Sequence, residues 1–489
     1  MNTICTTGEF MDDVEETCFI EMEDLNEYWD CEVITVDDSS AIDEPQIAAA
    51  QWSELPSLPL ELIYSFLNRP DQIRMSQVCR KWSEGYSSPP VWKSFQFYLP
   101  YSEISSEICP EVKFARKYSS MFRHVEIAST SIRIGMTDQS WRQLKVFLHI
   151  LTHNSQLQSI KFRNLGNYLR QLDDETYADI FRSIASFLES QNHLKSVEFR
   201  DCFYPFQEGV ELLRAATEKS RESLSQLVFR GFVDDEFSNR EQHASVAVSL
   251  PSLVSERLSN LTVLETDYSL IFDNMFPRQP LISDAFKNSK MNNLSKLVLH
   301  CEGFKQSHFQ GLSSAFWRCF SQYNPKLKIE LYFVPGSQSR REMEFYILPG
   351  MPITLLDYRL DRLHASSVMA IEVLYNHLLA CKMNDHLLAV YLVWMRPIPD
   401  LSTLHPFLQA CSKLKCLQLF TLYPANGIDV LLRSWIENRP ASLQEVLISI
   451  SNVRNEDDYL SLTTVADEYV PLLQVLGLNV FLIIDSNWR

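Results

Sequence analysis

The sequence predicts an α/β protein in which a small all-α module precedes a solenoid of parallel strands inside and helices outside. Three observations support this prediction. A short hydrophobic string of β type recurs eleven times between residues 122 and 448. Segments with helical hydrophobic periodicity lie between the strings. A separate cluster of apolar residues and tryptophans occupies residues 52–95, ahead of the first string.

Each string reads apolar, two residues, apolar, one residue, apolar, which is typical of a short strand with one buried face. Successive strings begin 26 to 37 residues apart. Eleven strings at this near-even spacing exceed what chance would place in a leucine-rich chain, so they indicate a repeat. The strings begin at Phe122, Leu157, Leu194, Leu224, Leu261, Leu294, Leu327, Ile353, Leu387, Leu414 and Leu443.

The intervals between the strings carry apolar residues three and four apart, as amphipathic helices do, most clearly within 177–190, 367–379 and 427–439. Strands joined through helices must run parallel with right-handed crossovers. One strand–helix unit can bury its apolar face only in a stack. An all-helical solenoid is the alternative, but it does not require strand-type alternation in every repeat.

This pattern resembles the leucine-rich-repeat family, whose strands line a concave face and whose helices lie outside. The sequence departs from the family pattern at one position. The asparagine or cysteine usual eight residues after the first leucine is met clearly only by Cys202. The repeats are also long and uneven, which affects the regularity of the loops more than the architecture.

The N-terminal cluster begins "WSELPSLPLELIYSFLNRP", and its apolar spacing predicts a helix that ends near residues 68–70. A module of this size cannot bury all of its apolar residues, so some must contact a partner. The cluster resembles an F-box in its Leu-Pro pair, its "IYSFL" segment, its Val-Cys pair and its two tryptophans. The resemblance implies adaptor binding by the following residues, or by the packing behind them: Leu55, Pro56, Leu58, Leu62, Ile63, Leu67, Val78, Cys79, Trp82 and Trp92.

Gln72 and Gln77 replace apolar residues common in F-boxes, so we expect them to lower adaptor affinity. F-box proteins with leucine-rich repeats are typically substrate receptors of SCF-type cullin–RING ubiquitin ligases. The resemblance therefore implies a Skp-family adaptor as partner, cullin and RING subunits beyond it, and a target protein on the repeats. Two alternatives are a plain three-helix cap for the solenoid and an interaction scaffold that forms no ligase.

The domain organisation follows from these patterns and from the charge. Residues 1–50 contain 15 Asp or Glu and no Lys or Arg, so we expect an acidic disordered tail. An F-box is expected at 51–97, a connecting segment at 98–121, and a solenoid of eleven to twelve units at 122–489. Subtracting the tail leaves 44 − 47 = −3 for the rest of the chain. This balance argues against a nucleic-acid partner, which needs clustered cations.

Composition also argues against several classes of site. Glycine is scarce, at 12 residues, and no glycine-rich phosphate loop or nucleophile elbow is visible, so neither an enzyme nor a cofactor is expected. His149 and His153 have metal-ligand spacing but no obvious third ligand, and we interpret them as structural. The apolar run 470–484 is too short and interrupted to span a membrane. Eleven cysteines without a paired motif fit the reducing cytoplasm or nucleus.

The strand register predicts which side chains line the concave face. The sixth residues after the string starts place Arg163, Arg200 and Arg230 side by side on neighbouring strands, with Lys161 next to them. Such a row favours an acidic or phosphorylated target, and solvated arginines balanced by acids are the equal alternative. Later repeats offer three aromatic candidates for target contact: Tyr391, Trp394 and Phe420.

Overall fold

The computed structural model describes residues 52–67, 69–99, 109–129, 138–154, 156–233, 259–268, 293–302, 312–336, 338–360 and 369–486. Two compact units divide the chain after Pro56. In the first unit the described residues are 52–56, with the 3₁₀ turn η1 at Trp52–Glu54. The acidic tail expected at 1–50 lies outside the described residues.

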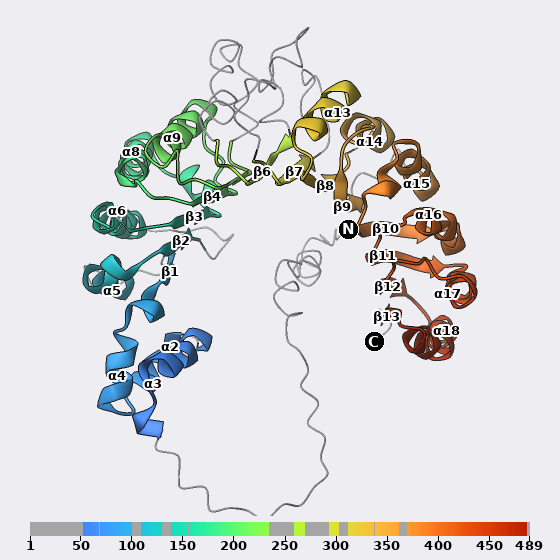
Figure 1. The fold of residues 1–489 in the computed structure, drawn as a ribbon, viewed down its shortest axis with the longest axis horizontal. Coiled ribbons are helices and arrows are strands. Elements are labelled where there is room, and N and C mark those ends of the chain that lie inside the picture. Colours follow the sequence, from blue (N-terminus) through green and yellow to red (C-terminus); the bar gives the residue numbers. More distant parts are fainter. Residues whose placement is uncertain are drawn as a thin grey trace, which may run out of the picture. The chain divides into compact units, whose positions relative to one another are not determined.

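The described strands of the second unit form one parallel sheet of thirteen strands, which follow one another in chain order (Figure 1). Each predicted string falls on one of the strands β2 to β12, so the predicted strand–helix solenoid is confirmed. The strands are β1 (Ser94–Tyr98), β2 (His124–Ala128), β3 (Ser159–Arg163), β4 (Ser196–Arg200), β5 (Gln226–Arg230), β6 (Val263–Asp267), β7 (Lys296–Glu302), β8 (Lys328–Val334), β9 (Ile353–Leu360), β10 (Ala389–Ile398), β11 (Cys416–Ala425), β12 (Glu445–Val453) and β13 (Asn479–Ser486).

Two strands were not among the predicted strings. Strand β1 pairs with β2, and β13 pairs with β12. The sheet therefore begins at Ser94 and not at residue 122, and helix α5 at Pro110–Tyr118 occupies part of the predicted connecting segment. The repeat pattern does not detect β1 because the strand buries Phe95 and Phe97 but lacks the leading apolar residue of that pattern.

The helices of the repeats cover one face of the sheet (Figure 1). Strand β3 illustrates the alternation, because Ile160 and Phe162 are fully buried whereas Lys161 and Arg163 are half-exposed. We call the face that carries Lys161 and Arg163, opposite the helices, the open face. The repeat helices are α5 (Pro110–Tyr118), α6 (Asp138–Thr152), α7 (Gly166–Leu169), α8 (Asp174–Ser190), α9 (Phe206–Glu218), α13 (Ser314–Tyr323), α14 (Ser339–Tyr346), α15 (Ile371–Ala380), α16 (Leu404–Ala410), α17 (Ile428–Glu437) and α18 (Glu456–Val475).

A continuous hydrophobic core lies between the sheet and the helices. Aromatic rings on neighbouring elements stack within it, for example Phe97 on Phe147 at 4.3 Å between centroids and Phe162 on Phe199 at 5.2 Å. Cys202, the residue that met the family pattern, is fully buried and its Sγ lies 3.5 Å from the carbonyl oxygen of Phe162. This contact joins successive repeats at a turn. Across the described ranges, no helix is long and apolar enough to cross a membrane.

Candidate interaction surfaces

Helix α2 (Ser57–Phe66) in the N-terminal module has two apolar faces. One face packs inward through Leu60 and Tyr64, which are 1% and 0% exposed. The other face presents Leu58, Leu62 and Phe66 to solvent, with exposed fractions of 75%, 59% and 80%. These three residues are four apart and therefore form a stripe along the helix.

The module continues through helices α3 (Arg69–Ser76) and α4 (Arg80–Tyr86) and the 3₁₀ turn η2 (Pro89–Trp92). Ile73 on α3 and Val78 in the following turn are also exposed, at 47% and 63%. Tyr64 Oη donates a hydrogen bond of 2.7 Å to the carbonyl oxygen of Trp82, which joins α2 to α4 behind the stripe. Soluble proteins rarely expose so many large apolar residues in one small module unless a partner covers them. We call Leu58, Leu62, Phe66, Ile73 and Val78 the N-terminal apolar surface.

The structure places the predicted adaptor-binding residues in three environments. Leu58, Leu62 and Val78 are exposed and belong to the N-terminal apolar surface, and Pro56 is also exposed. The sequence prediction omitted Phe66 and Ile73, although the four-residue spacing from Leu58 and Leu62 points to Phe66. The half-buried residues among those predicted are Leu55, Ile63, Leu67, Cys79 and Trp82.

Trp92 requires a correction, because it is 1% exposed and cannot contact a partner directly. Its indole Nε1 donates to the carbonyl oxygen of Tyr86. Its rings pack against Tyr86, Phe114 and Tyr118, with centroids 4.7, 4.2 and 5.5 Å away. Trp92 therefore belongs to the core that joins the N-terminal module to the first repeat.

Gln72 is also corrected. It is 5% exposed, and its side-chain amide donates to the carbonyl oxygens of Tyr64 at 2.8 Å and Leu67 at 3.1 Å. These carbonyls stand at the end of α2, where a helix leaves acceptors without intrahelical partners. Gln72 thus caps α2 from inside the module and does not face a partner.

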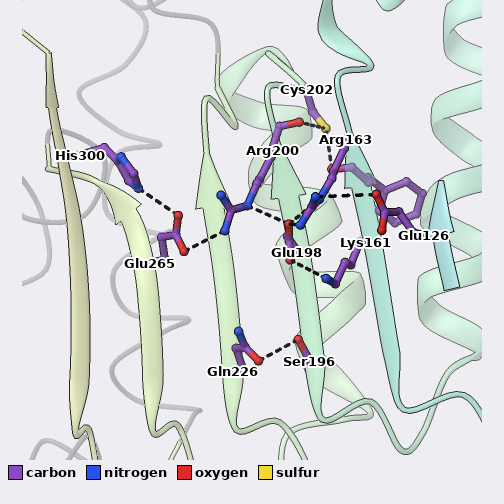
Figure 2. A network of polar contacts seen from close by, with 11 residues as sticks. Glu126, Lys161, Arg163, Ser196, Glu198, Arg200, Cys202, Gln226, Glu265 and His300 are labelled. Atoms are coloured by element: carbon purple, nitrogen blue, oxygen red, sulfur yellow. Dashed lines mark hydrogen bonds and ion pairs between the residues drawn. The ribbon is translucent and has the colours of Figure 1, made fainter. Parts of the chain in front are cut away.

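The open face carries the predicted arginine row (Figure 2). In the strand register Arg163 of β3 lies opposite Arg200 of β4, and Arg200 lies opposite Arg230 of β5. The predicted side-by-side placement is therefore confirmed. Three adjacent guanidinium groups repel one another unless acidic groups separate them.

Glu198 of β4 supplies the central counter-charge, and the residue is 3% exposed. Its Oε1 accepts a hydrogen bond of 2.8 Å from Arg163 Nε and lies 2.8 Å from Arg200 Nε. Lys161 Nζ lies 3.8 Å from the other carboxylate oxygen. A single buried carboxylate thus bridges three cations on two neighbouring strands.

Two further acids complete the network on either side of Glu198. Glu126 of β2 lies 3.7 Å from Arg163, and Glu265 of β6 lies 3.1 Å from Arg200 (Figure 2). Much of the row is therefore neutralised within the sheet, as the alternative interpretation expected. Arg230 differs, because it forms no ion pair with any residue that the structure describes.

His300 of β7 extends the network by a 2.9 Å hydrogen-bond contact between its Nε2 and Glu265 Oε1. Its ring stacks on Tyr332 with centroids 4.9 Å apart. Burial raises the pKa of Glu265, but the His300 hydrogen bond and the charges of Arg200 and Arg230 outweigh burial. The pKa of Glu265 consequently lies below its ordinary value, so this carboxylate is ionised at neutral pH.

The predicted aromatic candidates separate into two groups. Tyr391 and Phe420 are half-buried on the open face of β10 and β11. Trp394 was predicted wrongly, because it is 3% exposed and stacks on Tyr358 within the core at 5.9 Å. Trp394 has the same strand parity as the buried Leu392, so it points to the helices.

His149 and His153 lie at the surface near the end of α6, with ring centroids 5.2 Å apart. His153 Nδ1 lies 3.1 Å from the carbonyl oxygen of His149. Among the residues described, no group of three or more His, Cys, Asp or Glu is placed to hold a metal ion.

Comparisons with known proteins agree with this architecture. The family model of the F-box domain matches residues 52–93. The chain is similar to F-box/LRR-repeat protein 21 of Ovis aries, with 22% identity over 322 residues that cover 63% of this chain and 65% of the relative. The same-named proteins of Bos taurus and Mus musculus match at 34% over 68 residues and 37% over 54 residues, covering 14% and 11% of this chain and 16% and 12% of the relatives.

In each comparison the chain spans less than two thirds of the relative's length. The chain carries an F-box domain, and a leucine-rich-repeat-like solenoid follows it. The resemblance read from the sequence is thereby confirmed.

Proposed function

We propose that this chain is the substrate-recognition subunit of an SCF-type cullin–RING ubiquitin ligase. In this proposal the F-box domain docks on a Skp-family adaptor, which connects it to the cullin and RING subunits, and the open face binds a target protein. The N-terminal apolar surface carries the proposal. It is exposed on a domain that matches an F-box, where a partner would cover it.

The magnitude of the exposed area supports a specific partner. Fully burying a Leu or Phe side chain contributes about 1.5–3 kcal/mol. Leu58, Leu62 and Phe66 together would therefore contribute roughly 5–9 kcal/mol on binding, against association costs of about 4–15 kcal/mol. The half-buried Trp82 lies behind the stripe and gives a second apolar contribution.

The proposed subunit acts by position and performs no covalent step. Holding a target beside a ubiquitin-charged enzyme raises the effective concentration of the acceptor lysines and restricts their orientation. We place this action in the cytoplasm or the nucleus, where the free thiols of the chain would stay reduced.

Two parts of the open face are proposed for target contact. Arg230 and the half-exposed Lys161 would attract an acidic or phosphorylated segment, because Glu198 neutralises the arginines between them. Tyr391 and Phe420 would receive apolar side chains of the target. An interaction scaffold outside any ligase would use the same face, so the N-terminal apolar surface distinguishes the two functions.

Adaptor capture by the intact chain tests the proposal. Leu62→Asp places a charge in the middle of the exposed stripe, and we expect at least a tenfold loss of captured Skp-family adaptor. Val430→Asp is the matched control, because Val430 is 50% exposed on α17, outside the F-box domain. Equal capture by wild type and Leu62→Asp would favour the scaffold function.

A further inference from the structure

The last repeat of the solenoid has an apolar outer flank. Strand β13 exposes Phe481 and Ile483 on the open face at 41% and 50%. Helix α18 exposes Leu472, Val475 and Leu476 at 51%, 87% and 49%. Terminal repeats of solenoids normally present a polar outer surface to water. The flank of β13 and α18 therefore has the composition of an interface.

The backbone of β13 also has a free edge within the described residues, where β13 pairs with β12 alone. The N–H of Asn479 donates to the carbonyl oxygen of Gln444, so Asn479 and alternate residues after it face β12. The backbone groups of Val480, Leu482 and Ile484 consequently point to the other edge. An exposed apolar edge of this kind is a template for another strand.

We propose that β13 pairs with β13 of a second copy of this chain, antiparallel and centred on Leu482, to form a two-fold symmetric dimer. Leu482 then lies opposite itself in a hydrogen-bonded pair, and Val480 lies opposite Ile484 of the other copy. Phe481 lies opposite Ile483 on the open face, where such pairs approach most closely.

Charge complementarity favours this register. Asp485 is the charged residue of β13, and the pairing places it opposite the amide of Asn479. Centring the pair on Ile484 would instead place Asp485 opposite Ile483. Centring it on Val480 would leave Ile483 and Asp485 without a partner strand.

The helix layer is compatible with the same two-fold axis. On α18 the half-buried Thr463 and Val470 lie on one flank, whereas Leu472 and Leu476, one turn apart, are exposed on the other. The axis through Leu482 brings the second copy of α18 beside this exposed flank. Apolar residues of the strand edge and of the helix would thus be covered together.

A cysteine at the axis tests the pairing directly. Leu482→Cys should form an intermolecular disulfide under mild oxidation, because hydrogen-bonded antiparallel pairs have Cα atoms about 5.5 Å apart. Val480→Cys is the control, since it would face Ile484 and should stay uncrosslinked above the wild-type background. If the thiol of the Leu482→Cys variant neither crosslinks nor reacts with an alkylating reagent, another segment covers the edge, which contradicts the proposal.

Charge substitutions test the register in the intact chain by light scattering at several concentrations. Phe481→Glu and Ile483→Lys should each weaken dimerisation at least tenfold. The double variant should restore the dimer, because the glutamate introduced in each copy then faces the lysine introduced in the other. Val430→Lys on α17 should leave the dimer unchanged. A wild-type mass of 56.8 kDa at every concentration up to about 100 µM would overturn the proposal.

Discussion

Replacing Glu198 with glutamine should destabilise the repeats around β4 more than any exposed charge substitution in the chain. The carboxylate is 3% exposed and makes two close contacts of 2.8 Å with the guanidinium groups of Arg163 and Arg200. Glutamine keeps the shape and one acceptor but removes the charge. Two cations would then share a nearly buried site without their central counter-charge.

The expected loss follows from these contacts. A hydrogen bond to a charged group contributes about 1.5–3 kcal/mol, and two are weakened. The arginine side chains are 29% and 16% exposed and keep Glu126 at 3.7 Å and Glu265 at 3.1 Å, which reduces the cost. We therefore expect a decrease of about 2–3 kcal/mol in the free energy of unfolding.

Urea unfolding together with amide hydrogen exchange of β3, β4 and β5 measures this loss. Hydrogen exchange is needed because solenoids open by groups of repeats and two-state analysis of the whole chain is unsafe. Glu189→Gln, on the exposed surface of α8, is the control and should change stability by less than about 0.5 kcal/mol. If Glu198→Gln behaves like this control, the network is ordinary solvated surface and the reasoning is wrong.

Three further outcomes follow from buried groups. Trp92→Ala should cost about 3–5 kcal/mol of stability by thermal unfolding, and a cost below about 1 kcal/mol would contradict its placement in the core. Gln72→Ala should lower the melting temperature by exposing unsatisfied carbonyls at the end of α2, at about 1–3 kcal/mol, and an unchanged melting curve would exclude the cap. Glu265 has a lowered pKa, so the stability it contributes is complete above the ordinary value of 4.5 and is lost as the pH falls through the lowered one. Urea midpoints measured between pH 7 and about pH 3 should fall less steeply for Glu265→Gln than for wild type, and parallel curves would contradict this assignment.

The sequence predicted most of the solenoid because one physical pattern repeats in it. Strand alternation and helical spacing are local signals, and eleven copies of them reinforce one another. The two end strands deviate for local reasons. Strand β1 lacks the leading apolar residue, and β13 is nearly continuous in apolar residues at 480–484, which periodicity does not distinguish from a buried helix.

The candidate sites were predictable to the extent that register alone decides them. The arginine row follows from strand parity and is placed as predicted. Its neutralisation depends on Glu198, Glu126 and Glu265, which come from separate strands and whose distances no local pattern reveals. The burial of Trp92 and Gln72 likewise depends on contacts of α2 and α5 that form only in the folded chain.

Titration of a purified Skp-family adaptor into the intact chain, followed by calorimetry at several temperatures, tests the central claim most directly. The account predicts a complex of one adaptor per chain and a negative heat-capacity change, because the N-terminal apolar surface leaves water on binding. Phe66→Asp should weaken this binding at least tenfold, since Phe66 is 80% exposed in the free chain. Absence of binding by a folded wild-type chain, or equal affinity of the Phe66→Asp variant, would contradict the account.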